Sequence, residues 1–361
     1  MIYYTLGRSG LRISRLALGT MTFGEEWGWG ADQSGSRAIF DKYLEAGGNF
    51  IDTADLYTEG NSERLLGKFM TDANCRDDVV ISTNFTFNDS DGKPNNGGNG
   101  RKNILRAVEG SLERLQTDYL DLYIMHAWDR FTPVEEVMST LDDLITSGKV
   151  RHVAISDAPA WYISRAQTIS EYCNYDKFIA LQLEYSLLER NIEHEFVPLG
   201  QETGAGIMAW SPLGGGLLSG KYKPSEDGAS GEGRLATMQE SGNPAFDKFN
   251  ERNWKIVQTL EDVSRKLGRP MAQVAINWVA NQPGIAATLI GASKLPQLED
   301  NLQALDFTID PELLDQLNEV SKPPTPFPYT FFSGHIQEMV SGGAEVSNKP
   351  SGYTLPALLS K

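Results

Sequence analysis

The feature of this chain that most constrains its fold is a regular alternation of short apolar segments with amphipathic helical ones. The apolar segments are rich in β-branched residues and almost continuously hydrophobic, which is typical of strands buried on both faces of a parallel sheet. Eight such strands are predicted, at residues 16–20, 49–54, 79–84, 120–126, 150–157, 179–185, 206–213 and 287–292. Amphipathic helices are predicted between them, among others at residues 36–46, 102–115, 134–147 and 256–267. The chain is therefore expected to be an α/β protein.

The spacing of the strands indicates how they are connected. The first seven begin roughly every 30 to 40 residues, about the length of one strand–helix–strand unit. Because no linker, repeat or low-complexity tract divides the 361 residues, we predict a single domain over residues 1–361, a (β/α)₈ TIM barrel. An open doubly wound sheet is built from the same units and is the alternative.

Three segments depart from this alternation. Residues 85–103 and 212–250 are rich in Gly and follow the third and seventh strands, so both loops are expected on the catalytic face of a barrel. Loops of this length in compact domains are usually functional or disordered. The segment from residue 321 is rich in Pro and aromatic residues, and we expect the tail 321–361 to cover the barrel mouth.

The composition excludes several classes of function. With 40% hydrophobic residues the chain can close a core, so it is not intrinsically disordered. Its 48 acidic residues exceed its 32 basic ones and give a net charge of −16, which argues against nucleic acid and anionic membranes as partners. No stretch approaches the roughly 18 apolar residues that span a bilayer, and no apolar signal segment begins the chain, so a cytoplasmic protein is predicted.

Cysteine and histidine usage argues against disulfides and metal sites. The two cysteines, Cys75 and Cys173, are expected to be free thiols in a reducing compartment. The four histidines are scattered, with neither a His-x-x-x-His nor a Cys-x-x-Cys pattern, so no metal is predicted. The oligomeric state stays open.

Polar or aromatic residues end six consecutive predicted strands, the second to the seventh, and a glycine ends the eighth; in a TIM barrel the carboxyl ends of the strands carry the chemistry. These residues are Asp52, Asn84, His126, Ser156, Asp157, Gln182, Trp210, Ser211 and Gly291. Any one of them can simply be a polar residue where a strand reaches the solvent, but together they predict a polar site across the barrel mouth. Within it, Asp52, Tyr57 and His126 can form an acid–base group with the phenol as proton donor, although a lone histidine is more often structural.

Eight sequence motifs, in this order, carry a family resemblance. They are LALGTMTFG (16–24), NFIDTADLY (49–57), NSERLLG (61–67), LDLYIMH (120–126), GKVRHVAIS (148–156), LQLEYSLLER (181–190), AWSPLGGGLLSGKY (209–222) and IGASKLPQLEDNL (290–302). With these motifs the chain resembles the aldo-keto reductases, nicotinamide-dependent oxidoreductases on a (β/α)₈ barrel, from about Leu6 to Leu317. By contrast, Gly214-Gly215-Gly216 is not the Gly-x-Gly-x-x-Gly that opens a helix in dinucleotide-binding folds.

The family's catalytic tetrad is Asp, Tyr, Lys and His, and the resemblance places it at Asp52, Tyr57, Asn84 and His126, with asparagine where the family has lysine. In the family's mechanism the lysine ammonium lowers the pKa of the phenol, whereas an asparagine supplies only amide hydrogen bonds. We therefore expect weakened carbonyl reduction with intact cofactor binding, and a raised carboxyl pKa for Asp52 if it is buried. Asn84 is either natural or an engineered substitution.

The resemblance implies a nicotinamide cofactor, with NADP(H) preferred and NAD(H) possible. Trp210 would stack on the nicotinamide, and Ser156, Asp157 and Gln182 would hold its carboxamide. The pyrophosphate would lie against Ser211, Pro212, Leu213, Gly214, Gly216, Lys221 and Arg234, and the adenosine end against Gly291, Ser293, Lys294, Gln297, Asp300 and Asn301. Ser293 and Lys294 would meet a 2′-phosphate. Gly19, Thr20, Met21 and Asp52 complete the expected cofactor site.

The substrate pocket is expected to be walled by Trp27, Trp29, Tyr57, Phe85, His126 and Trp128. The function that follows is an NADP-dependent oxidoreductase that interconverts a carbonyl group and an alcohol by hydride transfer. Polar residues of the first long loop (Asn95, Asn96, Asn99 and Arg101) favour a sugar or glycoside as its substrate. The alternatives are a nicotinamide-binding regulatory subunit, like the potassium-channel beta subunits of the superfamily, and a redox-neutral sugar-modifying enzyme.

Overall fold

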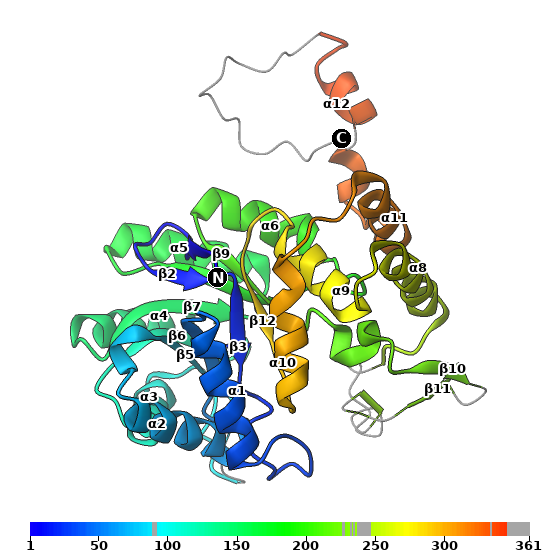
Figure 1. Ribbon diagram of the computed structural model, residues 1–361. Helices are drawn as coiled ribbons and strands as arrows, with labels where there is room; N and C mark the ends of the chain where they lie inside the picture. The colour runs from blue at the N-terminus through cyan, green and yellow to red at the C-terminus, as the bar shows by residue number, and fades with distance from the viewer. Residues whose placement is uncertain are drawn as a thin grey trace.

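The strands close into a parallel barrel. The structure is a computed structural model that describes residues 1–88, 92–225, 228–231, 233, 235–236, 247–332 and 334–344 (Figure 1). The order of hydrogen-bonded strands around the barrel is β12-β3-β4-β5-β6-β7-β8-β9. They run from β3 (Leu16–Gly19) through β4 (Phe50–Ala54), β5 (Val80–Phe85), β6 (Leu120–Met125), β7 (Val150–Ser156), β8 (Phe178–Glu184) and β9 (Gly206–Trp210) to β12 (Ile285–Ile290). The predicted TIM barrel is confirmed, and the open doubly wound sheet is excluded.

All eight predicted strands are present, and the largest difference lies at the end of β9. The strand stops at Trp210 rather than at residue 213, because Ser211 adopts the left-handed conformation (φ 55°) that no β-strand accommodates. The turn that follows is the 3₁₀ segment η3 (Gly214–Ser219).

Helices surround the strands in Figure 1. They are α1 (Gln33–Glu45), α2 (Asn61–Ala73), α3 (Arg101–Leu115), α4 (Val134–Thr146), α5 (Ala160–Cys173), α6 (Ile192–Thr203), α8 (Glu251–Leu267), α9 (Met271–Ala280), α10 (Leu295–Leu302), α11 (Pro311–Ser321) and α12 (Gly334–Val340). The periodicity did not predict α9, because every residue from 272 to 280 is buried and no polar stripe marks the helix. Among the described helices, none has the length and apolar character needed to cross a membrane.

A hairpin closes the amino end of the barrel, and its strands β1 (Tyr3–Thr5) and β2 (Arg12–Ser14) pair antiparallel. Leu6 and Ile13 from this hairpin belong to the interior cluster, with Ala17, Phe50 and Leu122 of the barrel strands. The interior is therefore a packed core at this end, as is usual in TIM barrels, and the open end lies at the carboxyl ends of the strands.

The loop after β9 is longer than the other connections and contains a second hairpin, β10 (Lys223–Ser225) with β11 (Gly228–Ser230). Beyond α11, the tail forms the 3₁₀ segment η6 (Tyr329–Phe332) and α12, which extends away from the strands in Figure 1. The Tyr329 hydroxyl donates to Glu195 of α6, and its ring packs on His194 with centroids 5.2 Å apart. Residues 345–361 lie outside the described residues, so the expected cover over the barrel mouth stays a prediction.

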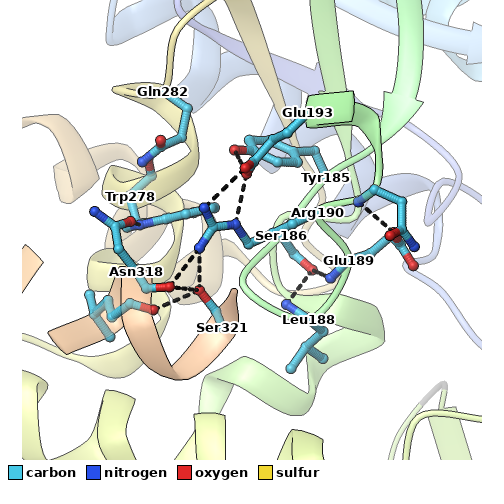
Figure 2. Close-up of polar contacts among 12 residues, drawn as sticks. Tyr185, Ser186, Leu188, Glu189, Arg190, Glu193, Trp278, Gln282, Asn318 and Ser321 are labelled. Carbon is cyan, nitrogen blue, oxygen red and sulfur yellow. Dashed lines mark hydrogen bonds and ion pairs between the residues drawn. The ribbon is translucent and has the colours of Figure 1, made fainter. Parts of the chain in front are cut away.

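One polar network fixes the end of α11, from which the tail departs (Figure 2). The Arg190 guanidinium donates to the carbonyl of Asn318 (2.9 Å) and the hydroxyl of Ser321 (2.7 Å), and it pairs with Glu193 (2.7 Å). Trp278 of α9 lies under the guanidinium, 5.1 Å from it, and donates to Asn318 (2.9 Å). A cation at the carboxyl end of a helix is favourable, so Arg190 ties the loop after β8 to α11.

Candidate active site

A cavity of about 550 Å³ opens at the carboxyl ends of the strands. Its walls come from the ends of β3, β4, β9 and β12, from η3, and from the start of α9 and of α10. Of the predicted site residues, those that line it are Gly19, Met21, Trp29, Asp52, Tyr57, Trp210, Ser211, Pro212, Leu213, Gly216, Lys221, Gly291, Ser293, Gln297, Asp300 and Asn301. Residues far apart in the sequence thus meet in one elongated site.

Asp52 is held by three neutral donors on one carboxylate oxygen. The residue is 2% exposed, and its Oδ1 accepts hydrogen bonds from Ser82 Oγ (2.7 Å), Gln182 Nε2 (2.9 Å) and Asn84 Nδ2 (3.3 Å). Asn84 also donates to the carbonyl of Thr53 (2.7 Å). Burial raises the pKa of Asp52 to about 6, although the three hydrogen bonds favour the carboxylate. No cation among the described residues forms an ion pair with Asp52.

Tyr57 and His126 lie next to each other, with ring centroids 6.0 Å apart and nearly perpendicular planes. Phe87 packs on the other side of His126 (4.9 Å), and Trp27 packs on Tyr57 (6.2 Å). Burial lowers the pKa of His126 to about 4, so its imidazole is neutral at neutral pH. Its Nδ1 atom is buried without a partner in the described structure, and it is free to bind a ligand or a water molecule.

The backbone that carries Tyr57 is strained. Thr58 and Glu59, which follow it, adopt left-handed conformations (φ 48° and 57°) that non-glycine residues rarely use. The Thr58 hydroxyl donates to the carbonyl of Phe23 (2.8 Å) and accepts from the amide of Ser62 (3.0 Å). Strain of this kind persists only where surrounding contacts enforce it, so the position of Tyr57 is fixed by the fold rather than left to a flexible loop.

Trp210 and Asp157 form the next part of the mouth. The indole Nε1 of Trp210 donates to Asp157 Oδ1 (3.4 Å), and Trp210 lines the cavity at the end of β9. Asp157 is exposed overall, and its backbone is left-handed (φ 42°). Its carboxyl group is nevertheless partly shielded from solvent in the barrel mouth, and this desolvation raises its pKa. Ser156 and Gln182, expected beside the carboxamide, lie behind the cavity wall, and Gln182 already donates its amide to Asp52.

The segment after β9 provides a cradle for an anion. Gly216 (φ 96°) approaches Lys221 so closely that a Cβ on it would lie 2.8 Å from the lysine Cε atom. Lys221 lines the cavity, forms no ion pair among the described residues, and has its pKa lowered by desolvation. The Lys221 ammonium lies 5.1 Å from the centroid of the Tyr222 ring, and a cation in the cavity wall without a carboxylate partner suits a phosphate group. Gly214 is buried and does not line the cavity, and Arg234 lies outside the described residues.

Another part of the cavity is organised by Gln297. Its Oε1 accepts from the amide and hydroxyl of Ser293 (3.0 and 3.2 Å) and from the amide of Lys294 (3.2 Å). Asp300 accepts from Gln273 of α9 (2.8 Å), and Asn301 donates to the carbonyl of Gly291 (3.4 Å). The cavity thus combines aromatic and acid–base side chains, a lysine and a group of polar side chains around Gln297. This combination fits an extended nicotinamide dinucleotide.

Several predicted residues lie elsewhere. Phe85 is fully buried and stacks on Tyr123 (4.5 Å), because side chains alternate along β5 and Asn84 takes the inward position, so Phe85 is not a pocket wall. Thr20 is buried too, and its hydroxyl donates to the Asp52 carbonyl (3.0 Å). Trp128 packs on Trp161 and Tyr162 without lining the cavity.

Two of the four polar residues singled out in the first long loop, Asn99 and Arg101, serve its folding. Asn99 is buried, accepts from the Thr86 hydroxyl (2.7 Å) and donates to the Ala127 carbonyl (2.8 Å). Arg101 pairs with Asp143 of α4 (2.6 Å). Because these side chains are used within the protein, they are no argument for a sugar substrate.

Sequence reasoning missed some of the site. Ser82 lies two residues before Asn84 on β5, and the alternation of side chains along a strand was enough to place it on the same face. Pro270, Ala272 and Ile276 line the cavity from the start of α9, and these residue types carried no chemical signal. Among the described residues no group of three or more His, Cys, Asp or Glu could hold a metal ion.

Comparison with known proteins agrees with this geometry. The sequence model described as "Aldo/keto reductase family" matches residues 15–322. The chain is 37% identical over 330 residues to "Uncharacterized oxidoreductase YrpG" of Bacillus subtilis, covering 89% of this chain and 96% of that protein. It is 32% identical to a norsolorinic acid reductase of Aspergillus flavus, covering 90% and 81%. It is also 31% identical to an aryl-alcohol dehydrogenase [NADP(+)] of Phanerodontia chrysosporium, covering 90% and 86%.

Proposed function

Because the chain belongs to the aldo/keto reductase family of oxidoreductases, we propose that it interconverts a carbonyl compound and an alcohol by hydride transfer, with NADP(H) preferred over NAD(H). One observation carries this proposal: Asp52, Tyr57, Trp210 and Lys221 line the same cavity. A proton donor, an aromatic platform and a lysine that forms no ion pair among the described residues are therefore available to one cofactor and one substrate.

The chain's own residues suggest how the cofactor is oriented. When bound, a nicotinamide supplies or accepts the hydride. Trp210 offers a ring surface next to Tyr57 for the nicotinamide end, and Lys221 offers a cation for the pyrophosphate. Ser293 and Lys294 carry a hydroxyl, two amides and a cation, and a phosphate that takes these donors over from Gln297 would be held there, which supports NADP(H).

Proton transfer to the carbonyl oxygen is the task of Tyr57. His126, neutral and packed against Tyr57, orients a substrate oxygen by hydrogen bonding. General acid catalysis of this type contributes about 10² to 10⁴ in rate. Asn84 places an amide where an ammonium would assist the phenol, so we propose that the natural rate lies well below that of a lysine-containing site.

The substrate end is aromatic in character. Trp29 lines the cavity, and the ring centroid of Trp27 lies 5.7 Å from that of Trp29. Phe87 packs on His126. Flat rings pack well against such walls. Since one relative is named for aryl alcohols, we propose aromatic aldehydes or ketones as the substrate class.

The proposal is tested by titrating NADPH into the protein and following tryptophan fluorescence, because Trp210, Trp29 and Trp27 lie in or next to the cavity. Benzaldehyde is then added to the same sample, and oxidation of NADPH is followed by its absorbance. The Asn84→Lys variant is measured beside the natural chain.

Saturable quenching with slow turnover, faster in the lysine variant, is the expected result. Quenching without turnover in either protein, over a panel of aldehydes and ketones, would favour a regulatory role. The absence of quenching by both NADPH and NADH would exclude the proposal.

A further inference from the structure

We infer that Asp52 is the proton reservoir of this site: its carboxyl group keeps a proton on Oδ2 and passes it to the Tyr57 hydroxyl when a carbonyl compound is reduced. The inference rests on the proposed function and assigns the origin of the proton in that reaction. Asp52 acts through Tyr57 in this role and does not itself contact the substrate.

The surroundings of the Asp52 carboxyl group are neutral. Asp52 is almost completely buried, and its hydrogen-bond partners Ser82, Asn84 and Gln182 are all uncharged. No Lys or Arg among the described residues pairs with it. Ionising a carboxyl group that is buried without a cation is unfavourable, so such a group keeps its proton to a higher pH than an exposed aspartate does.

The hydrogen bonds to Asp52 indicate where that proton lies. All three donors reach Oδ1, and no hydrogen bond in the described structure reaches Oδ2. An oxygen that accepts three hydrogen bonds is the carbonyl-like oxygen of the acid, so the proton belongs on Oδ2. Asp52 and Tyr57 line the same cavity, so a proton that leaves Asp52 enters the space that the Tyr57 side chain faces. The raised pKa of Asp52, about 6, agrees with this arrangement.

Of the other titratable groups around Asp52, the neighbouring strands β3 and β5 carry none. Glu184 at the end of β8 pairs with Lys248, and His126 beyond β6 is neutral. Lys221 lies across the cavity.

Asp157 at the end of β7 is the one carboxyl group in the described site that competes for the role, because its pKa is also raised by desolvation. Its carboxyl group accepts from the Trp210 indole (3.4 Å) and none of the three side-chain donors that hold Asp52 reaches it, so the two carboxyl groups have different partners.

The reaction balances with these groups. Hydride from the reduced nicotinamide forms the new C–H bond, and the carbonyl π electrons move to oxygen. The oxygen takes the Tyr57 hydroxyl proton, and the Tyr57 oxygen takes the proton from Asp52 Oδ2. The products are an alcohol, an oxidised nicotinamide and an Asp52 carboxylate, which recovers its proton from solvent through the cavity.

The first test is the pH dependence of turnover by the full chain, with saturating NADPH and benzaldehyde. If Asp52 supplies the proton, kcat falls by about tenfold per pH unit above pH 6, where the carboxyl loses its proton. In Asp52→Asn this decrease is absent and the remaining rate is low at every pH. In Asp157→Asn the decrease is unchanged, and in Asn84→Lys it moves to higher pH because an ammonium then assists the phenol.

The second test does not depend on activity. Infrared difference spectra between pH 5 and pH 8, with ¹³C-labelled aspartate, report the protonated carboxyl band. The band is expected in the natural protein and in Asp157→Asn, with a smaller amplitude in the latter, and its component titrating near pH 6 is lost in Asp52→Asn.

Two outcomes would overturn the inference while the proposed function stands: turnover that does not change between pH 5 and pH 8, or a decrease that disappears in Asp157→Asn and persists in Asp52→Asn. Absence of NADPH binding and turnover at every pH, in the Asn84→Lys variant as well, would overturn the proposed function and this inference with it.

Discussion

Two buried carboxyl groups lie on opposite faces of β5, and their partners differ. Glu63 of α2, fully buried on the outer face, accepts from the Thr83 hydroxyl (2.6 Å) and pairs with Arg114 Nε (2.6 Å). Asp52, on the inner face, accepts only from neutral donors. A buried carboxylate beside a guanidinium stays ionised, whereas one without a cation has a raised pKa and can gain and lose a proton near neutral pH. The Glu63–Arg114 pair stabilises the fold, whereas the Asp52 carboxyl group can take part in proton transfer.

The strongest way to test this comparison is to remove the cation from the structural pair. Arg114→Ala leaves Glu63 buried and unpaired, and breaking a buried pair in this way costs about 3 to 5 kcal/mol of unfolding free energy. Urea unfolding followed by circular dichroism measures the loss.

The matched control is Arg101→Ala, which breaks the exposed pair with Asp143 and is expected to cost less than about 1 kcal/mol. Equal losses in the two variants would show that burial does not distinguish these pairs.

The second prediction concerns the other carboxyl. The pKa of Asp52 rises from about 3.9 in the unfolded chain to about 6 in the folded protein, so the folded state binds the proton more tightly. The stabilisation is complete below about pH 4 and is lost as the pH rises through 6, by up to about 3 kcal/mol.

His126 acts in the opposite direction over the same range, because its folded pKa is lowered to about 4. The quantity to measure is therefore the difference in unfolding free energy between the natural chain and Asp52→Asn at pH 4.5 and pH 7.5. A difference that does not change with pH would contradict the raised pKa.

The third prediction converts the functional carboxyl into a paired one. Asn84→Lys gives Asp52 a cation of the kind that Glu63 already has. We expect the rate of benzaldehyde reduction to increase by about a hundredfold, the lower part of the range for general acid catalysis. Stopped-flow oxidation of bound NADPH in one turnover measures this step. An unchanged rate would mean that Asn84 does not limit proton transfer.

Burial and side-chain alternation explain which parts of the structure the sequence predicts. Strands buried on both faces are continuous apolar runs, so all eight were found, and polar residues at their carboxyl ends marked the mouth. The buried helix α9 has no polar stripe, and it was missed. Whether Phe85 or Asn84 faces the interior depends on the register of β5, which the apolar run alone does not reveal.

The Gln182–Asp52 hydrogen bond was beyond sequence reasoning for another reason. It joins β8 to β4 across the barrel, 130 residues apart, and exists only once the sheet has closed. The Gln182 donor reaches Asp52 only because the barrel closes. The absence of lysine at position 84 was already evident from the sequence.

The smallest predicted effect concerns Gln297 in the cavity. Like Asn84, it is a neutral amide at a position where a cation would strengthen the proposed function. The Gln297 carbonyl occupies three donors from Ser293 and Lys294 that a phosphate would otherwise use. Gln297→Arg releases these donors and adds a guanidinium, which binds phosphate in bidentate fashion. NADPH is expected to bind about tenfold more tightly, about 1.4 kcal/mol, with little change for NADH.

Tryptophan quenching with each cofactor measures both affinities. Gln303→Arg, on an exposed position just after the same helix, adds the same charge outside the cavity and controls for the general field of the protein. If Gln303→Arg strengthens NADPH binding as much as Gln297→Arg does, net charge explains the gain. If only Gln297→Arg does so, the neutral amide at this position limits the preference for NADP(H), just as the neutral amide of Asn84 limits proton transfer.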